Sequence, residues 1–180
     1  MAEMFRELGA VVVDADEATH AVYAPGSEGF NQVVREFGQE YVRDGQIDRA
    51  RLGEVVFHDE GARSRLNAIV HPLVRQWMAD RTAEAFDGGA KVVIHDVPLL
   101  FENGLEGVYS DVVLVYTPAP VQVARLTEGR GLSIDRANAM LAAQMPIDEK
   151  RARAQHLIDN SGTPEETRDQ VRKLWPVISK

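Results

Sequence analysis

The chain has 180 residues, of which 44% are hydrophobic and 27% charged, with a formal net charge of −8 and no cysteine. This length and composition are typical of a single globular domain, and the lack of cysteine excludes a disulfide framework and a thiolate metal site. The acidic balance argues against a nucleic-acid partner bound by broad electrostatic attraction. No apolar run reaches the roughly 18 residues that span a bilayer, and the first residues lack the features of a signal peptide. We therefore expect a cytoplasmic protein with no membrane partner.

The first part of the chain predicts a helix, a buried strand and two further helices. Residues 2–8 have the pattern of a helix end, and the apolar run at 11–14 predicts a buried strand. Residues 15–22 and 27–37 predict helices, the second of which begins at a serine that can cap it.

Residues 44–87 differ in kind, because helical patterns follow one another there with no strand between them. Asp48 and Asp59 can cap the first two helices. Pro72 suits the first turn of a third helix, which runs to residue 86. We expect an all-helical subdomain inserted beside a sheet.

The second half of the chain returns to an alternation of strands and helices. Strands are predicted at 92–96, 112–116 and 155–159, and helices at 121–128, 133–144 and from 163 to the end. Buried apolar strands that alternate with helices indicate an α/β protein with a parallel sheet.

Two carboxylates stand at the tip of the first strand. Carboxyl ends of strands are where open α/β sheets place their chemistry, so Asp14 is a candidate general base toward a hydroxyl group. Alternatively, Asp14 and Asp16 together orient a metal-bound water. The structural alternative is that an aspartate at the strand exit caps the helix that follows. Spacing alone leaves these interpretations open.

Asp96 ends the second strand in the position of a Walker B acid, which holds Mg²⁺ directly or through water. The alternative is a carboxylate that pairs with an arginine. Pro98 then ends strand pairing and turns the chain, which can aim the following loop across the ligand edge of the sheet.

Several cationic and polar side chains are candidates for anion or nucleotide binding. His71 and Arg75 lie one helical turn apart and suit a shared anion site, although a histidine beside a proline is also a common helix-junction residue. Arg130 lies between two glycines, on an expected flexible turn between two helices. Such a hairpin can bring arginine over a transferring phosphoryl group, or it can be a solvated helix pair. Asn160 follows the last strand, where it can read an adenine or simply belong to a strand-to-helix turn.

Taken in order, these segments resemble the dephospho-coenzyme A kinase family over nearly the whole chain. The stretches that carry the resemblance are ELGAVVVDAD, PGS, DGQIDRARL, IVHPLV, DVPLLFENGL, ARLTEGRGL, AAQM and LIDNSG. The resemblance implies a P-loop kinase-like parallel sheet flanked by helices, in one kinase-like domain. Its implied parts are a core at 1–29, 87–119 and 151–180, a helical substrate-binding subdomain at 30–86 and a small helical lid at 120–150.

The implied reaction is ATP-dependent phosphorylation of the ribose 3′-hydroxyl of dephospho-coenzyme A, the last step of coenzyme A biosynthesis. ATP is then a co-substrate and Mg²⁺ the metal, and we expect a monomer or a weak homo-oligomer. On the matching positions, the catalytic residues are Asp14 and Arg130, and Asp96 is the metal ligand. The nucleotide-binding residues are Arg125, Arg130 and Asn160. The substrate-binding residues are Asp16, His71, Arg75, Pro98, Leu99 and Glu102.

One part of the family pattern is missing from the 180 residues. Family members open with a buried strand and a loop of the type G-x-x-x-x-G-K-[ST], which cradles phosphates and binds Mg²⁺ through a hydroxyl group. That first core strand would lie between the strands at 92–96 and 112–116, so we expect those two strands in one sheet with a strand-wide gap.

This departure predicts that the chain as written is inactive. Our hypothesis is that Met1 is a misplaced start. The alternative is a non-catalytic dephospho-coenzyme A-binding fragment or pseudokinase. A kinase for nucleosides or shikimate would need different segments in place of IVHPLV and DVPLLFE.

Overall fold

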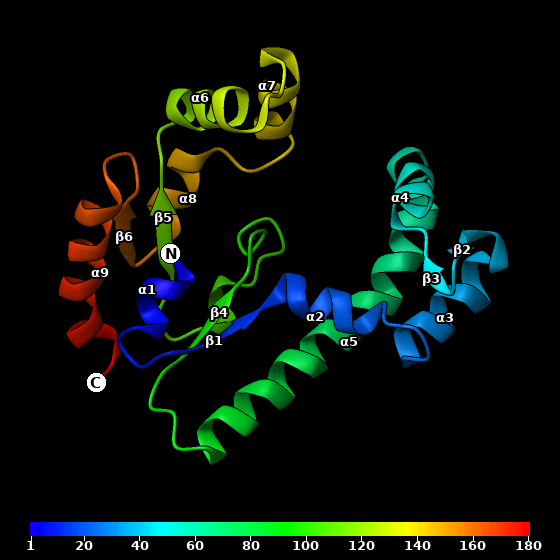
Figure 1. Ribbon diagram of the computed structural model, residues 1–180, viewed down its shortest axis with the longest axis horizontal. Helices are drawn as coiled ribbons and strands as arrows, with labels where there is room; N and C mark the ends of the chain where they lie inside the picture. The colour runs from blue at the N-terminus through cyan, green and yellow to red at the C-terminus, as the bar shows by residue number, and fades with distance from the viewer. The chain divides into compact units, whose positions relative to one another are not determined.

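The computed structural model describes residues 1–180, which form two compact units. One unit is the contiguous segment Ala10–Val97, and the other combines Met1–Gly9 with Pro98–Lys180. Figure 1 shows the elements of both, and each unit is described by itself. No helix in either unit has the length and apolar character needed to cross a membrane.

The contiguous unit contains a parallel strand pair. Strand β1 (Val11–Asp14) pairs with β4 (Val93–Asp96), and the register aligns the first residues of both strands and the last residues of both strands. Valine and isoleucine favour extended backbone, which explains why these short runs form strands. Helix α5 (Glu60–Asp87) packs against both strands (Figure 1).

The helical part of this unit is built around a second core. Helices α2 (Ala15–Val22), α3 (Glu28–Phe37), α4 (Arg49–His58) and α5 surround it. Its buried residues are Val22, Val33, Ile47, Leu52 and Val70. The predicted caps are confirmed, because Ser27, Asp48 and Asp59 each accept a hydrogen bond from a backbone N–H in the first turn of α3, α4 and α5.

The expectation of an all-helical insertion is wrong in one place. A short 3₁₀ turn (Gln39–Tyr41) leads into a hairpin of β2 (Val42–Arg43) and β3 (Gln46–Ile47). Its two turn residues, Asp44 and Gly45, have φ values of 51° and 75°. An Asp-Gly pair with positive φ at both positions is a favoured hairpin turn, so the sequence did contain the signal.

The expected helix boundary at Pro72 is also wrong. Helix α5 is continuous over 28 residues, and Pro72 lies inside it. A proline inside a helix costs about 3 kcal/mol because one hydrogen bond is lost. Apolar residues on both sides of Pro72, among them Leu66 and Val74, pack against the same core, and this burial holds the helix together through the proline.

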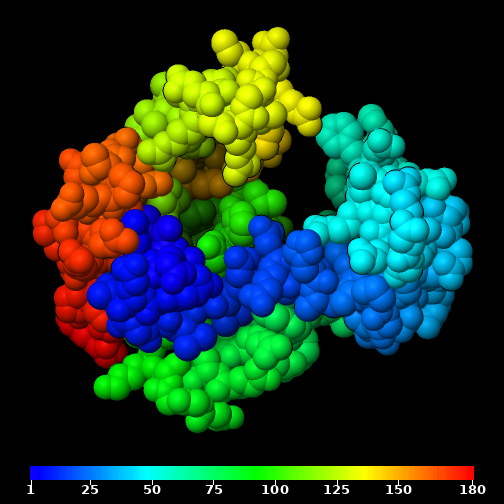
Figure 2. Space-filling view, viewed as in Figure 1, coloured from blue at the N-terminus to red at the C-terminus, as the bar shows by residue number.

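The other unit contains its own parallel pair. Strand β5 (Val113–Tyr116) pairs with β6 (His156–Asp159), and α8 (Ile147–Arg153) packs on β5. Helix α9 (Pro164–Ile178) begins with a capping box of Thr163 and Glu166 and packs on β6. The N-terminal helix α1 (Ala2–Arg6) packs against α9, so that the dark blue and red ends of the chain meet in Figure 2.

Helices α6 (Ala119–Arg130) and α7 (Ile134–Ala142) form a helical hairpin in this unit. We expected Arg130 on a flexible turn between two glycines. It is instead the last residue of α6, because Gly131 adopts a left-handed conformation (φ 66°) that caps the helix one residue later.

The strands form three separate two-stranded sheets, β1–β4, β2–β3 and β5–β6. Strands β4 and β5 are therefore not hydrogen-bonded to each other, as the expected gap between them requires, and the gap itself stays a prediction. The two larger sheets are parallel and flanked by helices, as predicted for an α/β fold.

Candidate active site

Two of the candidate carboxylates lie side by side at the end of one strand pair. Asp14 ends β1, Asp96 ends β4, and the two residues are register partners. Adjacent strands are about 4.8 Å apart, so both carboxylates stand at the same edge of the sheet. The ends of β1 and β4 therefore bring two polar residues together in the contiguous unit.

Asp14 is also the N-cap of α2. Its Oδ1 atom accepts hydrogen bonds from the backbone N–H groups of Asp16 (2.7 Å) and Glu17 (3.3 Å). The structural interpretation of Asp14 is thus confirmed. It does not exclude the catalytic one, because the cap uses Oδ1 and leaves Oδ2 for a second contact. Asp16 itself is exposed in the first turn of the helix.

His71 and Arg75 belong to one row of side chains along α5. Positions 71, 75, 78 and 82 recur at helical spacing and so share a face. In this row Met78 is buried, and Thr82 contacts β4 through His95. His71 and Arg75 continue the row toward the N-terminus of α5, and both side chains are exposed.

His95 is a residue that sequence reasoning missed, and it supports β4 next to Asp96. The hydroxyl of Thr82 donates to the carbonyl oxygen of Met78 at 2.7 Å, so its oxygen is left to accept from Nε2–H of His95, also at 2.7 Å. Burial lowers the pKa of His95. The neutral His95 side chain, with its proton on Nε2, therefore links β4 to α5 by a hydrogen bond.

In the other unit, Glu102 is engaged in the scaffold. Its Oε1 atom accepts from Lys150 Nζ at 2.6 Å and from the backbone N–H of Met145 at 3.0 Å. Burial by itself would raise the pKa of Glu102, but the bonds from Lys150 and the backbone outweigh it and the pKa is lowered. Pro98 and Leu99, from the same segment, are exposed in a turn.

The candidate nucleotide-binding residues are partly brought together. Arg125 on α6 donates from Nη2 to the carbonyl oxygen of Asn160 at 2.7 Å. The side-chain oxygen of Asn160 lies 3.1 Å from Oγ1 of Thr167 on α9. Arg130 is exposed at the end of α6, one to two turns beyond Arg125.

The candidate residues thus fall into two sets. The contiguous unit holds Asp14, Asp16, His71, Arg75 and Asp96, and the other unit holds Pro98, Leu99, Glu102, Arg125, Arg130 and Asn160. No group of three or more His, Asp or Glu side chains is suited to hold a metal ion by itself. Mg²⁺ is usually held by one or two carboxylates together with substrate phosphates and water, and Asp96 at the end of β4 can supply one such carboxylate.

Comparison with solved structures supports an α/β phosphotransferase. The chain is similar to the crystal structure of TT1252 from Thermus thermophilus, with a TM-score of 0.85 and 32% identity over 98% of this chain and 88% of that chain. It is also similar to the dephospho-CoA kinase from Campylobacter jejuni, with a TM-score of 0.71 and 26% identity over 98% and 89% of the two chains. These likenesses, together with the strand-end carboxylates, define the class as an α/β kinase.

The sequence comparisons narrow that class to one family. A family model described as dephospho-CoA kinase matches residues 1–166. The dephospho-CoA kinase of Geobacillus kaustophilus is 45% identical over 98% of this chain and 90% of its own length. That of Symbiobacterium thermophilum is 45% identical over 96% of this chain and 72% of its own length. The chain belongs to the dephospho-CoA kinase family.

Proposed function

We propose that this protein takes part in the transfer of the γ-phosphoryl group of ATP to the ribose 3′-hydroxyl of dephospho-coenzyme A, the last step of coenzyme A biosynthesis. The observation that carries the proposal is the pairing of Asp14 with Asp96 at the end of β1 and β4, in a chain of this family. Phosphoryl transfer to an alcohol needs a base for the hydroxyl proton and an acid that holds the metal beside it.

In this proposal Asp14 is the general base. Two backbone N–H groups fix Oδ1, so Oδ2 is held in one orientation to accept the proton of the 3′-hydroxyl. The hydroxyl oxygen forms a new bond to the γ-phosphorus, the bond from that phosphorus to the bridging β–γ oxygen breaks, and ADP leaves. Asp96 would hold Mg²⁺, which supplies neutralisation of the phosphate charge when it is bound.

We further propose roles for the remaining candidates. Residues 30–86 form the substrate-binding part, in which His71 and Arg75 bind anionic groups of dephospho-coenzyme A. Asp16, in the core, binds a polar group of the same substrate. Residues 120–150 form the lid, and their α6 and α7 pack mainly on each other. Arg125, Arg130 and Asn160 contact ATP. Pro98, Leu99 and Glu102 border the substrate, with Glu102 acting from its bond to Lys150.

The 180 residues contain no G-x-x-x-x-G-K-[ST] loop. We therefore propose that a chain of these residues alone binds dephospho-coenzyme A but does not turn over ATP. The second candidate function, a non-catalytic binding protein, is the one that such a chain would retain.

The test combines intact mass, substrate binding and turnover for the protein purified from its own source. A mass above 19.9 kDa with ATP-dependent coenzyme A formation supports the kinase. A mass of 19.9 kDa with binding and no turnover supports the binding protein. If turnover is present, the Asp14→Asn variant should lose it by at least about 100-fold while retaining substrate affinity. Failure to bind dephospho-coenzyme A would contradict both functions.

A further inference from the structure

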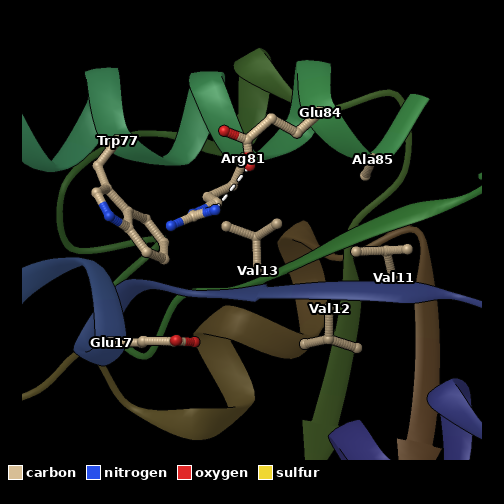
Figure 3. Close-up of a pocket in the computed structure, with 8 residues that line it drawn as sticks. All are labelled: Val11, Val12, Val13, Glu17, Trp77, Arg81, Glu84 and Ala85. Carbon is tan, nitrogen blue, oxygen red and sulfur yellow. Dashed lines mark hydrogen bonds and ion pairs between the residues drawn. The ribbon is translucent and has the colours of Figure 1, made fainter. Parts of the chain in front are cut away.

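A cavity of about 510 Å³ lies at the free edge of β1, beneath α5. It is built entirely from the contiguous unit, and its volume is within the range of small-molecule sites. Figure 3 shows the side chains that line it, with Val13 on the α5 side of the strand and Val12 on the opposite side. The lining residues are Val11, Val12, Val13, Glu17, Trp77, Arg81, Glu84 and Ala85.

The strand edge offers backbone hydrogen bonds to this cavity. The N–H of Val11 donates to the carbonyl oxygen of Val92 at 3.0 Å, so Val11 faces β4. Successive residues of a strand direct their backbone groups to alternate edges, which turns the N–H and carbonyl of Val12 away from β4. No other strand is hydrogen-bonded to β1. The edge at Val12 can therefore pair with an amide group of a ligand, as a further strand would.

The side chains of the cavity do not suit a polyanion. The guanidinium of Arg81 lies between the Trp77 ring and Val13, 5.1 Å from the ring centroid (Figure 3). It is already paired with Glu84 at 2.7 Å, and Glu17 adds a second carboxylate to the lining. The net charge of the lining is negative, so a phosphate group is disfavoured. The valines, Ala85 and the indole favour an uncharged chain with apolar groups.

The cavity adjoins the proposed base. Glu17 lines the cavity with its side chain, while its backbone N–H donates to the carboxylate of Asp14. Val13, the buried residue before Asp14, forms another part of the wall. From Asp14 the edge extends back to Val11 over about 10 Å, at 3.3 Å per residue. A ligand whose reacting end lies at Asp14 can thus extend along this edge.

We propose that the cavity binds the pantetheine arm of dephospho-coenzyme A. This inference rests on the proposed function. It adds the binding site of the pantetheine arm, the end of the substrate that does not react. The arm is uncharged, carries amide groups that can pair with Val12, and has a geminal dimethyl group that can pack on Val13 and Trp77. The charged diphosphate stays outside the cavity, whose lining carries a net negative charge.

The first test fills the cavity in the full chain. Ala85→Leu places a larger side chain in the cavity wall, whereas Ala83→Leu makes the same change at an exposed position of α5 that does not line it. Calorimetric titration with dephospho-coenzyme A should show affinity reduced about tenfold in Ala85→Leu and unchanged in Ala83→Leu. Equal affinity in wild type and both variants overturns this inference and leaves the proposed function standing. No binding by the wild type overturns both.

A second test needs no variant, and so does not depend on how Ala85→Leu folds. Pantetheine without the nucleotide is titrated into the wild-type chain, and amide and indole N–H resonances are followed by NMR. We expect shifts at the Val12 amide and the Trp77 indole N–H. Saturable shifts confined to other residues, or no shifts at millimolar pantetheine, would overturn the inference.

Discussion

Asp14 combines a local structural task with its proposed chemical one. Its Oδ1 atom caps α2 through Asp16 and Glu17, which fixes the side chain at the tip of β1. A general base benefits from such fixation, because its free oxygen is presented in one orientation. The cap and the base therefore use different oxygens of one carboxylate.

Substitutions at Asp14 should separate the two tasks. Asparagine caps helices about as well as aspartate, so Asp14→Asn should leave the free energy of unfolding nearly unchanged. Asp14→Ala loses the cap and should reduce that free energy by about 1 kcal/mol. Urea unfolding of the two variants measures the difference. If Asp14→Asn destabilises as much as Asp14→Ala, the carboxylate charge, rather than the cap, stabilises this site.

His95 should make stability depend on pH. Because burial lowers its pKa in the folded protein, the unfolded chain binds more protons below the ordinary pKa of about 6.5. The contribution of His95 is then fully present above that pH and is lost as the pH falls toward the folded pKa. Urea unfolding between pH 7.5 and 5 should show the loss.

The matched variant for this prediction is His95→Gln, which keeps a nitrogen donor near Oγ1 of Thr82 but does not titrate. Its unfolding free energy should vary less over the same pH range than that of the wild type. An identical pH dependence in both proteins would show that other groups cause it.

At the scale of elements, the ion pair of Glu102 and Lys150 joins the turn after Pro98 to α8. The side chains are 19% and 8% exposed, so removal of one partner leaves a poorly solvated charge. Arg153 and Glu106 form a second ion pair between the same two segments. Met145, two residues before α8, also donates its backbone N–H to Glu102, so the segment that leads from α7 into α8 is held by the same carboxylate.

Lys150→Met should therefore be strongly destabilising, by about 3 kcal/mol. Adding Glu102→Gln removes the orphaned charge, so the double variant should recover part of that loss. Chemical unfolding of the single and double variants gives the coupling between the two residues. Additive losses would contradict a direct ion pair.

Short-range signals predicted most helix starts in this sequence. Ser27, Asp48, Asp59, Ser133 and Thr163 all cap helices through side-chain hydrogen bonds, as their type and position indicated. Pro72 and Gly129 were expected to break helices, but neither does. Helix α5 continues through Pro72 because of its packing, and α6 runs past Gly129 to Arg130, where the left-handed Gly131 caps it. Helix α8 was missed, because it is short and follows Pro146 without a side-chain cap.

Side-chain contacts between residues far apart in the chain could not be predicted from the sequence. The adjacency of Asp14 and Asp96 was predictable, because both end buried parallel strands. The contacts of Glu102 with Lys150 and of Thr82 with His95 were not, because nothing in the local pattern of either residue indicates its partner. The roles proposed for the site residues stay predictions.

At the scale of the whole molecule, the contiguous unit should fold when it is produced alone. Ala10–Val97 contains both strands of its sheet, all of α5 and two clusters of buried apolar residues. A segment of this size can bury enough surface for independent stability. Far-UV circular dichroism of the isolated segment should show high helix content and one cooperative thermal transition. A non-cooperative melt would contradict this prediction.

The meeting of α1 with α9 has a consequence for the order of events during synthesis. The ribosome releases residues in order from the N-terminus, at about 5–20 per second, so α9, the partner of α1, emerges on the order of 10–40 s after it. Ala10–Val97 can condense while translation continues, whereas Phe5, which is 4% exposed in the finished protein, has to wait for α9. During that interval the apolar side chain of Phe5 stays exposed on the nascent chain.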